Sequence, residues 1–245
     1  MTKALHLWLT LSFASSLICI GCSNAPGKPG PGPEVRRPQD VMEFATLYQQ
    51  NCAGCHGREG KGGAAMPLAN PVYLGFAGEA TVRKIAANGV AGSLMPGFGT
   101  AAGGTLTDAQ INSLVSGIYR AWSSAHALDG SLPPPYQATG QPDQQQGKRA
   151  FAEFCADCHG PDGEGVKATG ANRRNAVAGS ITDASYLALV SDQSLRSTII
   201  AGRPDDGMPD WRSNARSAAR AMTNREVTDV VAWLGARRTT DPGKR

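Results

Sequence analysis

Two copies of a Cys-x-x-Cys-His motif constrain this chain more than any other feature. The first copy occupies residues 52–56 and the second residues 155–159. This spacing is the attachment signature of c-type haem. The two thiols add across the two vinyl groups of one porphyrin, and the adjacent histidine reaches the iron from one face. The motifs therefore predict two covalently bound haem c groups, with these thiols and histidines: Cys52, Cys55 and His56; Cys155, Cys158 and His159.

Two other chemistries use paired cysteines, and neither fits as well. A thioredoxin-like redox pair does not require the trailing histidine, which both motifs have. A zinc site would have to join motifs that lie far apart in the chain, and each motif brings its own histidine. Haem attachment is therefore the favoured interpretation.

Composition agrees with a cofactor-filled interior. Aromatic residues make up only 6% of the 245 residues, while the chain has 30 glycines and 16 prolines. Segments of about 100 residues with so few aromatics bury a thin core, and a porphyrin would supply the missing apolar interior. The net charge of +4 comes from basic residues interleaved with acidic ones. This pattern disfavours a nucleic-acid partner.

The N-terminus has the features of an export signal. Residues 1–22 contain Lys3, then an apolar stretch that ends in small residues. Ile-Gly-Cys-Ser at residues 20–23 resembles a bacterial lipobox, which implies diacylation of Cys22; Cys19 departs from that pattern, and ordinary cleavage nearby is the alternative. Either outcome places the chain on the exported side of the membrane. Residues 23–39 are rich in proline and glycine and predict a semi-extended tether.

The sequence pattern of the rest of the chain indicates an internal duplication of one domain. Residues at equal distances before two methionines match: Val82, Arg83 and Gly89 before Met95; Leu195, Arg196 and Gly202 before Met208. Apolar periodicity predicts helices near residues 41–48, with Asp40 as N-cap, and at 80–88, 107–119, 148–154, 192–201 and 223–234. A Pro- and Gln-rich segment separates the two copies, and its polyproline geometry would make a semi-rigid spacer.

Both copies resemble class I cytochrome c domains. The resemblance implies an all-α fold of two tandem domains, each a few helices wrapped around one covalent haem. We expect the domains at 40–122 and 142–238, the linker at 123–141 and a tail at 239–245. The motif histidines would be the proximal iron ligands, and Met95 and Met208 the distal ones.

Several finer assignments follow from the same comparison. Met66 is a rival to Met95, but it lies only ten residues after His56 and is expected to pack at the haem edge. Pro67 resembles the family proline whose carbonyl accepts from the proximal histidine. The second copy has no proline there, so either another carbonyl holds His159 or its iron is tuned differently. His126 is expected to be a surface residue.

The first and last helices of such a domain cross closely, usually with a glycine against an aromatic residue. We predict that Phe44 packs over Gly117 in the first copy and Trp233 over Gly147 in the second, with the large and small partners exchanged. Arg83 and Arg196 either pair with haem propionates or are solvated. An insert near residues 167–190 either docks a partner or covers a haem edge.

Iron held by histidine and thioether has no open position for a substrate. This favours a carrier of single electrons over an enzyme. The family resemblance implies a membrane respiratory complex as redox partner, and the lipobox resemblance implies a lipid on Cys22 as membrane anchor. A dihaem oxidoreductase of the peroxidase or thiosulfate dehydrogenase type, with one labile ligand, is the first alternative. A structural or gas-sensing haem module is the second.

Overall fold

The computed structural model describes residues 30, 32, 35–166, 179–212 and 220–239. The chain divides into two units, Met1–Asp40 and Val41–Arg245. In the first unit, the 3-10 turn η1 (Pro38–Asp40) is accompanied by an ion pair of 2.8 Å between Arg37 and Asp40. The export signal and Cys22 lie outside the described residues. No helix in the described part of the chain is both long enough and apolar enough to cross a bilayer.

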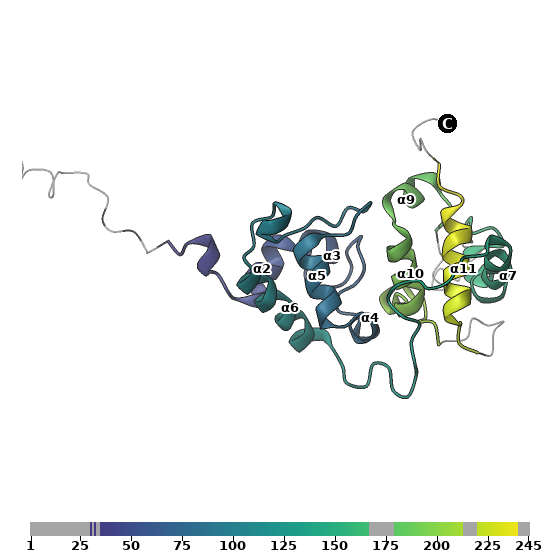
Figure 1. Cartoon of the computed structure of the whole chain (residues 1–245), viewed down its shortest axis with the longest axis horizontal. Helices are drawn as coiled ribbons and strands as arrows, with labels where there is room; N and C mark the ends of the chain where they lie inside the picture. Colours follow the sequence, from purple (N-terminus) through teal and green to yellow (C-terminus); the bar gives the residue numbers. More distant parts are fainter. Residues whose placement is uncertain (1–29, 31, 33–34, 167–178, 213–219, 240–245) are drawn as a thin grey trace, which may run out of the picture. The chain divides into compact units, whose positions relative to one another are not determined.

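The first repeat is helical (Figure 1), and it supplies all but one of the buried residues of a hydrophobic core, the exception being Ala201. Its elements are α2 (Phe44–Asn51), α3 (Ala53–His56), α4 (Pro71–Ala77), α5 (Glu79–Asn88), η2 (Thr100–Ala102) and α6 (Asp108–Trp122). Helix α6 places Ile111, Leu114, Val115 and Ile118 in that core, at the spacing of one helix face. The described residues therefore confirm the all-α expectation here.

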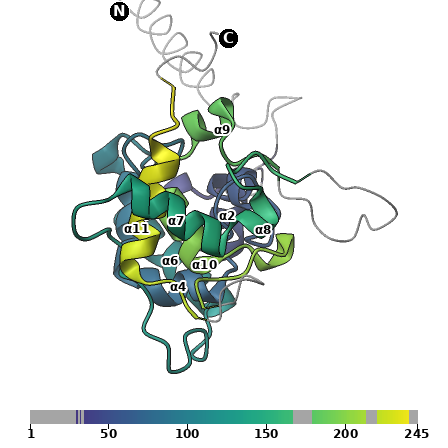
Figure 2. The same ribbon diagram turned by 90° about the vertical axis from the view of Figure 1, so that its right-hand side faces the viewer.

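The second repeat has the same plan. Its elements are α7 (Gln144–Phe154), α8 (Ala156–His159), α9 (Ala184–Leu189), α10 (Asp192–Ala201), η3 (Pro204–Asp206) and α11 (Asn224–Gly235). Helices α7 and α11 lie against each other (Figure 2). Phe151 and Trp233 contribute buried rings to this core, with 4.5 Å between their centroids.

Equivalent backbone contacts confirm the duplication. The amide of Leu106 donates to the carbonyl of Phe98 at 2.8 Å, and the amide of Met222 donates to that of Trp211 at 2.9 Å. The last helix of each repeat then starts with a capping box, made by Thr107 and Gln110 in α6 and by the corresponding Thr223 and Glu226 in α11. The register expected from the sequence is thus the one that the chain adopts.

The helix crossings are confirmed with their exchanged partners. A Cβ added to Gly117 would collide with the ring of Phe44, and a Cβ added to Gly147 would lie 2.9 Å from the Cβ of Trp233. Each glycine therefore allows the backbone of one helix to approach an aromatic residue of the other.

The expected start of the first helix was wrong. Helix α2 begins at Phe44 with Glu43 as its N-cap, and Asp40 belongs to η1. Tertiary contacts explain the difference, because the Val41 carbonyl accepts from Gln110 at 3.0 Å and the Met42 carbonyl from Ser113 at 3.1 Å. Carbonyls engaged by α6 hold this stretch against that helix.

The two short helices α4 and α9 were not predicted. Their sequence signals are the N-caps, since Asn70 and Asp183 each accept hydrogen bonds from two backbone amides of the following turn. In α9, Leu187 is fully buried in the core. The expected insert thus contributes a core residue at one end, while residues 167–178 lie outside the described chain.

Arg196 differs from one of the two expectations for it, that of a solvated helix residue. It is 2% exposed, and its guanidinium donates to the carbonyls of Pro135 and Tyr136 and to the side chains of Thr228 and Asn224. The interpretation of a solvated helix arginine is therefore wrong for Arg196. Arg83 does lie on a helix surface, where it pairs with Glu79 at 2.8 Å.

The cap of α11 predicts a pH dependence of stability. Arg220, together with hydrogen bonds from Thr223, lowers the pKa of Glu226 from 4.5 to about 2. A depressed folded-state pKa stabilises the fold above about pH 4.5, and this contribution is lost as the pH falls towards about 2. We expect Glu226→Gln to remove that pH-dependent part, about 1 kcal/mol after screening at the half-exposed Arg220, when unfolding is followed by circular dichroism. Gln110 fills the same capping position without charge, so Gln110→Ala in the first repeat should lower stability by an amount that does not depend on pH in this range.

Candidate haem sites

Both Cys-x-x-Cys-His motifs form one short helical turn directly after a longer helix. The amide of Cys52 donates to Tyr48 at 2.8 Å and the amide of Cys155 to Phe151 at 2.8 Å. The motif histidine amides then donate to the carbonyls of Cys52 and Cys155, each at 3.0 Å. The two thiols of each motif thus lie about one turn apart, as two thioether bonds to a single porphyrin require.

No disulfide joins the four motif cysteines. Cys55 and Cys158 are exposed, whereas Cys52 is buried and Cys155 is half-buried. Burial, reinforced by the neighbouring thiol, raises the pKa of Cys52 and of Cys155 to about 12.

His56 is oriented by a backbone carbonyl. Its Nδ1 donates to the carbonyl oxygen of Met66 at 2.7 Å. Burial lowers the pKa of His56, against the opposite effect of that hydrogen bond, so the ring is neutral at neutral pH. With the proton on Nδ1, the lone pair of Nε2 is available to a metal, which is the arrangement that iron ligation needs.

The carbonyl that accepts from His56 was assigned to the wrong residue. We expected Pro67, but the acceptor belongs to Met66, which precedes it. The proline ring fixes the backbone immediately after this carbonyl and has no N–H of its own. Met66 itself packs against the first core, in agreement with its expected packing role.

His159 has no equivalent contact in the described part of the chain. Its Nδ1 is buried without a hydrogen-bond partner among the described residues, and burial lowers its pKa. The residue at the same distance along the chain as Met66 is Thr169, which lies outside the described residues.

The two methionine loops have the same fold. The carbonyl of Met95 accepts from Val90 at 3.0 Å, and that of Met208 accepts from Arg203 at 2.9 Å. Each loop follows a glycine that ends a helix in a positive-φ conformation, Gly89 at +74° and Gly202 at +67°. Both methionine residues are half-buried. The structure therefore gives each motif a matching methionine loop.

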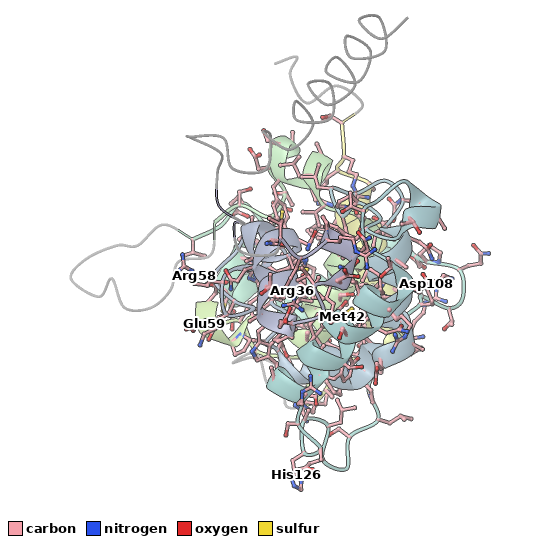
Figure 3. The ribbon with its side chains drawn as sticks, turned by 90° about the vertical axis from the view of Figure 1, so that its left-hand side faces the viewer. Arg36, Met42, Arg58, Glu59, Asp108 and His126 are labelled. Carbon is pink, nitrogen blue, oxygen red and sulfur yellow. The ribbon has the colours of Figure 1, made fainter. Side chains whose placement is uncertain are left out.

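Some details of the sites were not foreseen. The hydroxyl of Tyr48 donates to the Gly57 carbonyl at 2.9 Å and braces the turn after the first motif. His126 is exposed and lies 3.2 Å from Asp129 on a loop away from the helices (Figure 3), which confirms it as a surface residue.

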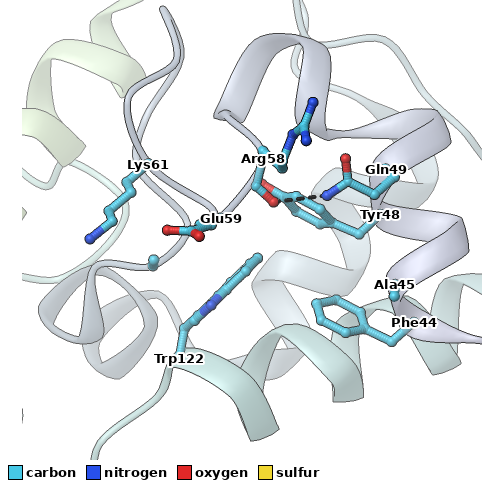
Figure 4. Close-up of a pocket in the computed structure, with 9 residues that line it drawn as sticks. Phe44, Ala45, Tyr48, Gln49, Arg58, Glu59, Lys61 and Trp122 are labelled. Atoms are coloured by element: carbon cyan, nitrogen blue, oxygen red, sulfur yellow. Dashed lines mark hydrogen bonds between the residues drawn. The ribbon is translucent and has the colours of Figure 1, made fainter.

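A separate hollow of about 400 Å³ lies beside α2 and the end of α6 (Figure 4). Its lining includes none of the motif cysteines, motif histidines or loop methionines. It consists of Phe44, Ala45, Tyr48, Gln49, Arg58, Glu59, Lys61, Ala69 and Trp122. This hollow is therefore distinct from the candidate haem sites.

Comparison with known families agrees with the duplicated geometry. Residues 39–116 match the family described as cytochrome c oxidase, cbb3-type, subunit III, and residues 144–237 match cytochrome c. The chain carries two tandem cytochrome c domains. As a dihaem cytochrome it has two covalently bound haem c groups as cofactors.

Individual relatives of this dihaem cytochrome carry two kinds of name. It is 29% identical over 194 residues to "Cbb3-type cytochrome c oxidase subunit CcoP" of Azospirillum sp. (strain B510), covering 73% of this chain and 60% of the relative. The subunit of the same name from Cereibacter sphaeroides is 26% identical, with coverages of 80% and 62%. "Thiosulfate dehydrogenase" of Stutzerimonas stutzeri (strain A1501) is 32% identical, with coverages of 54% and 45%. The dihaem cytochrome thus spans about half to three fifths of these relatives.

Proposed function

We propose that this chain is an electron-transfer dihaem cytochrome c that relays single electrons between two His/Met-ligated haems on the exported side of a membrane. The observation that carries this proposal is the repetition of a complete site. Each repeat pairs a Cys-x-x-Cys-His turn with a methionine loop closed by an equivalent hydrogen bond. When bound, each haem supplies a one-electron iron couple.

Each repeat would supply one set of residues to hold one haem. Thioether bonds would come from Cys52 and Cys55 and from Cys155 and Cys158, and axial ligands from His56 with Met95 and from His159 with Met208. Met66 is a weaker candidate than Met95, because its main chain already contacts Nδ1 of His56, the nitrogen that does not face the metal. The domains would extend over residues 40–122 and 142–238.

In this function the protein would orient the iron ligands and keep substrates away from the iron. The Met66 carbonyl orients His56, and the Gly89 and Gly202 turns orient the two methionine loops. A thioether and an imidazole as the two protein ligands would favour reduced iron and would leave no position for a substrate. We therefore assign the chain as a carrier or electron-transfer subunit, and not as a catalytic subunit.

The partner would be a membrane respiratory complex. Two of the relatives named above are subunits of cbb3-type cytochrome c oxidases, which supports a terminal oxidase as the electron acceptor. A lipid on Cys22 would hold the chain at the membrane surface, with residues 23–39 as its tether. A thiosulfate dehydrogenase is the second candidate, supported by the relative of that name.

A redox titration of the purified holoprotein tests the proposal. Followed by absorbance, it should show two reversible one-electron steps from low-spin haem, and neither azide nor carbon monoxide should bind without displacement of a methionine. Both haems should be reoxidised by solubilised terminal oxidase. A high-spin ferric signal with thiosulfate-dependent reduction would instead support the dehydrogenase.

A further inference from the structure

Asn70 makes contacts in both repeats with one side chain. It is 2% exposed and caps α4, where its Oδ1 accepts from the amides of Val72 at 3.0 Å and Tyr73 at 3.1 Å. Its Nδ2 donates to the carbonyls of Ala201 at 3.0 Å and Gly202 at 3.2 Å, at the end of α10. Both polar atoms of this buried side-chain amide are thus hydrogen-bonded, Oδ1 within the first repeat and Nδ2 to the second repeat.

The acceptor side of this contact is the start of the Met208 loop. Gly202 ends α10, and the next residue, Arg203, exchanges two backbone hydrogen bonds with Met208, of 2.9 and 3.0 Å. Arg203 also reaches the first repeat, since its guanidinium donates to the Gly63 carbonyl at 3.5 Å. The start of the loop is therefore held from the first repeat at two neighbouring residues, Gly202 and Arg203.

The donor side belongs to the segment that orients His56. Asn70 follows Met66 by four residues, and the Met66 carbonyl accepts from Nδ1 of that histidine. Leu68, between them, is buried in the first core, and so is Ala201 of α10. A short, well-packed path thus connects the proximal histidine of one repeat with the methionine loop of the other.

An amide is needed for this contact but not for capping. Asp183 caps α9 through Oδ1 with the same pattern of two amide donors, at 2.8 and 3.2 Å, although a carboxylate has no N–H to donate. The Nδ2 group of Asn70 is not needed for the cap, and it donates to the two carbonyls at the end of α10. A carboxylate at this position would instead face two carbonyl oxygens.

We propose that Asn70 is a positioning residue that locks the Met208 loop and couples it to the His56 segment of the first repeat. The proposal rests on the role of Met208 as iron ligand. The lock is additional to the linker, because Arg196 holds the Pro135 and Tyr136 carbonyls against α10 independently of Asn70. Loss of the amide should therefore free the loop while the repeats stay joined.

Asn70→Ser and Asn70→Asp test this in the holoprotein, because both keep a capping acceptor and remove the amide donors. By hydrogen exchange with mass spectrometry, we expect protection of the Arg203 and Met208 amides to fall about tenfold, the equivalent of one hydrogen bond. The potential of the haem assigned to Met208 should shift, and the potential of the other should not. Asp183→Ser, which alters the matched cap of α9, should leave protection of the Arg203 and Met208 amides unchanged.

The outcomes separate the lock from the ligand assignment. Unchanged protection in both Asn70 variants would overturn the lock, and changed protection with an unmoved potential would overturn its positioning role. Met208→His assigns the potentials, because it should lower only the wave of that haem. If it moved neither wave, the ligand assignment would fail, and hydrogen exchange alone would then decide whether Asn70 holds the loop.

Discussion

Gly147→Ala is expected to destabilise the second repeat by about 3 kcal/mol. An added Cβ would collide with the carbonyl of Asp229 and lie 2.9 Å from the Cβ of Trp233. Overpacking a close contact costs roughly 1–3 kcal/mol, and the value should lie at the upper end because the obstacle is helix backbone. Denaturant unfolding of the holoprotein, followed by circular dichroism, measures the loss.

The first repeat supplies the matched control. A Cβ on Gly117 would meet the side chain of Phe44 instead of the backbone of α2. The cost of Gly117→Ala should therefore be partly recovered by Phe44→Ala, with a coupling of about 1 kcal/mol in a double-mutant cycle. Trp233→Ala should give no such recovery for Gly147→Ala, and a full rescue there would show that the crossing is looser than the structure indicates.

Met95→Ala is expected to lower the potential of one haem by about 0.1 V or more, within the range of about 0.8 V that axial ligands cover. The change removes the soft sulfur donor that favours reduced iron. The variant should also bind carbon monoxide readily in the reduced state. Redox titration and absorbance spectra provide the measurement.

Met66→Ala is the decisive comparison for that experiment. Met66 contributes a backbone carbonyl to His56, which alanine retains, and a side chain that packs against the first core. We expect a modest loss of stability and a nearly unchanged potential. A low potential and carbon monoxide binding in Met66→Ala, with neither in Met95→Ala, would reverse the ligand assignment.

Much of each site could be predicted because its chemistry is local in the chain. Two thiols and a histidine within five residues fulfil the bonding needs of one haem, whatever the surrounding fold. The equal spacing before Met95 and Met208 likewise predicted the turns at Gly89 and Gly202, which the structure confirms. The pairing of Phe44 with Gly117 followed from the resemblance to class I cytochrome c domains, combined with the alignment of the two copies.

The sequence by itself thus determined the cofactor chemistry, the duplication and the helix crossings. Tertiary structure alone decided which distant groups meet: Asn70 with Gly202, Arg196 with Pro135, and Gln110 with Val41. The reason is physical. Periodicity and motif spacing report on neighbours along the chain, whereas a buried amide or guanidinium takes whichever carbonyl the packed fold brings within reach.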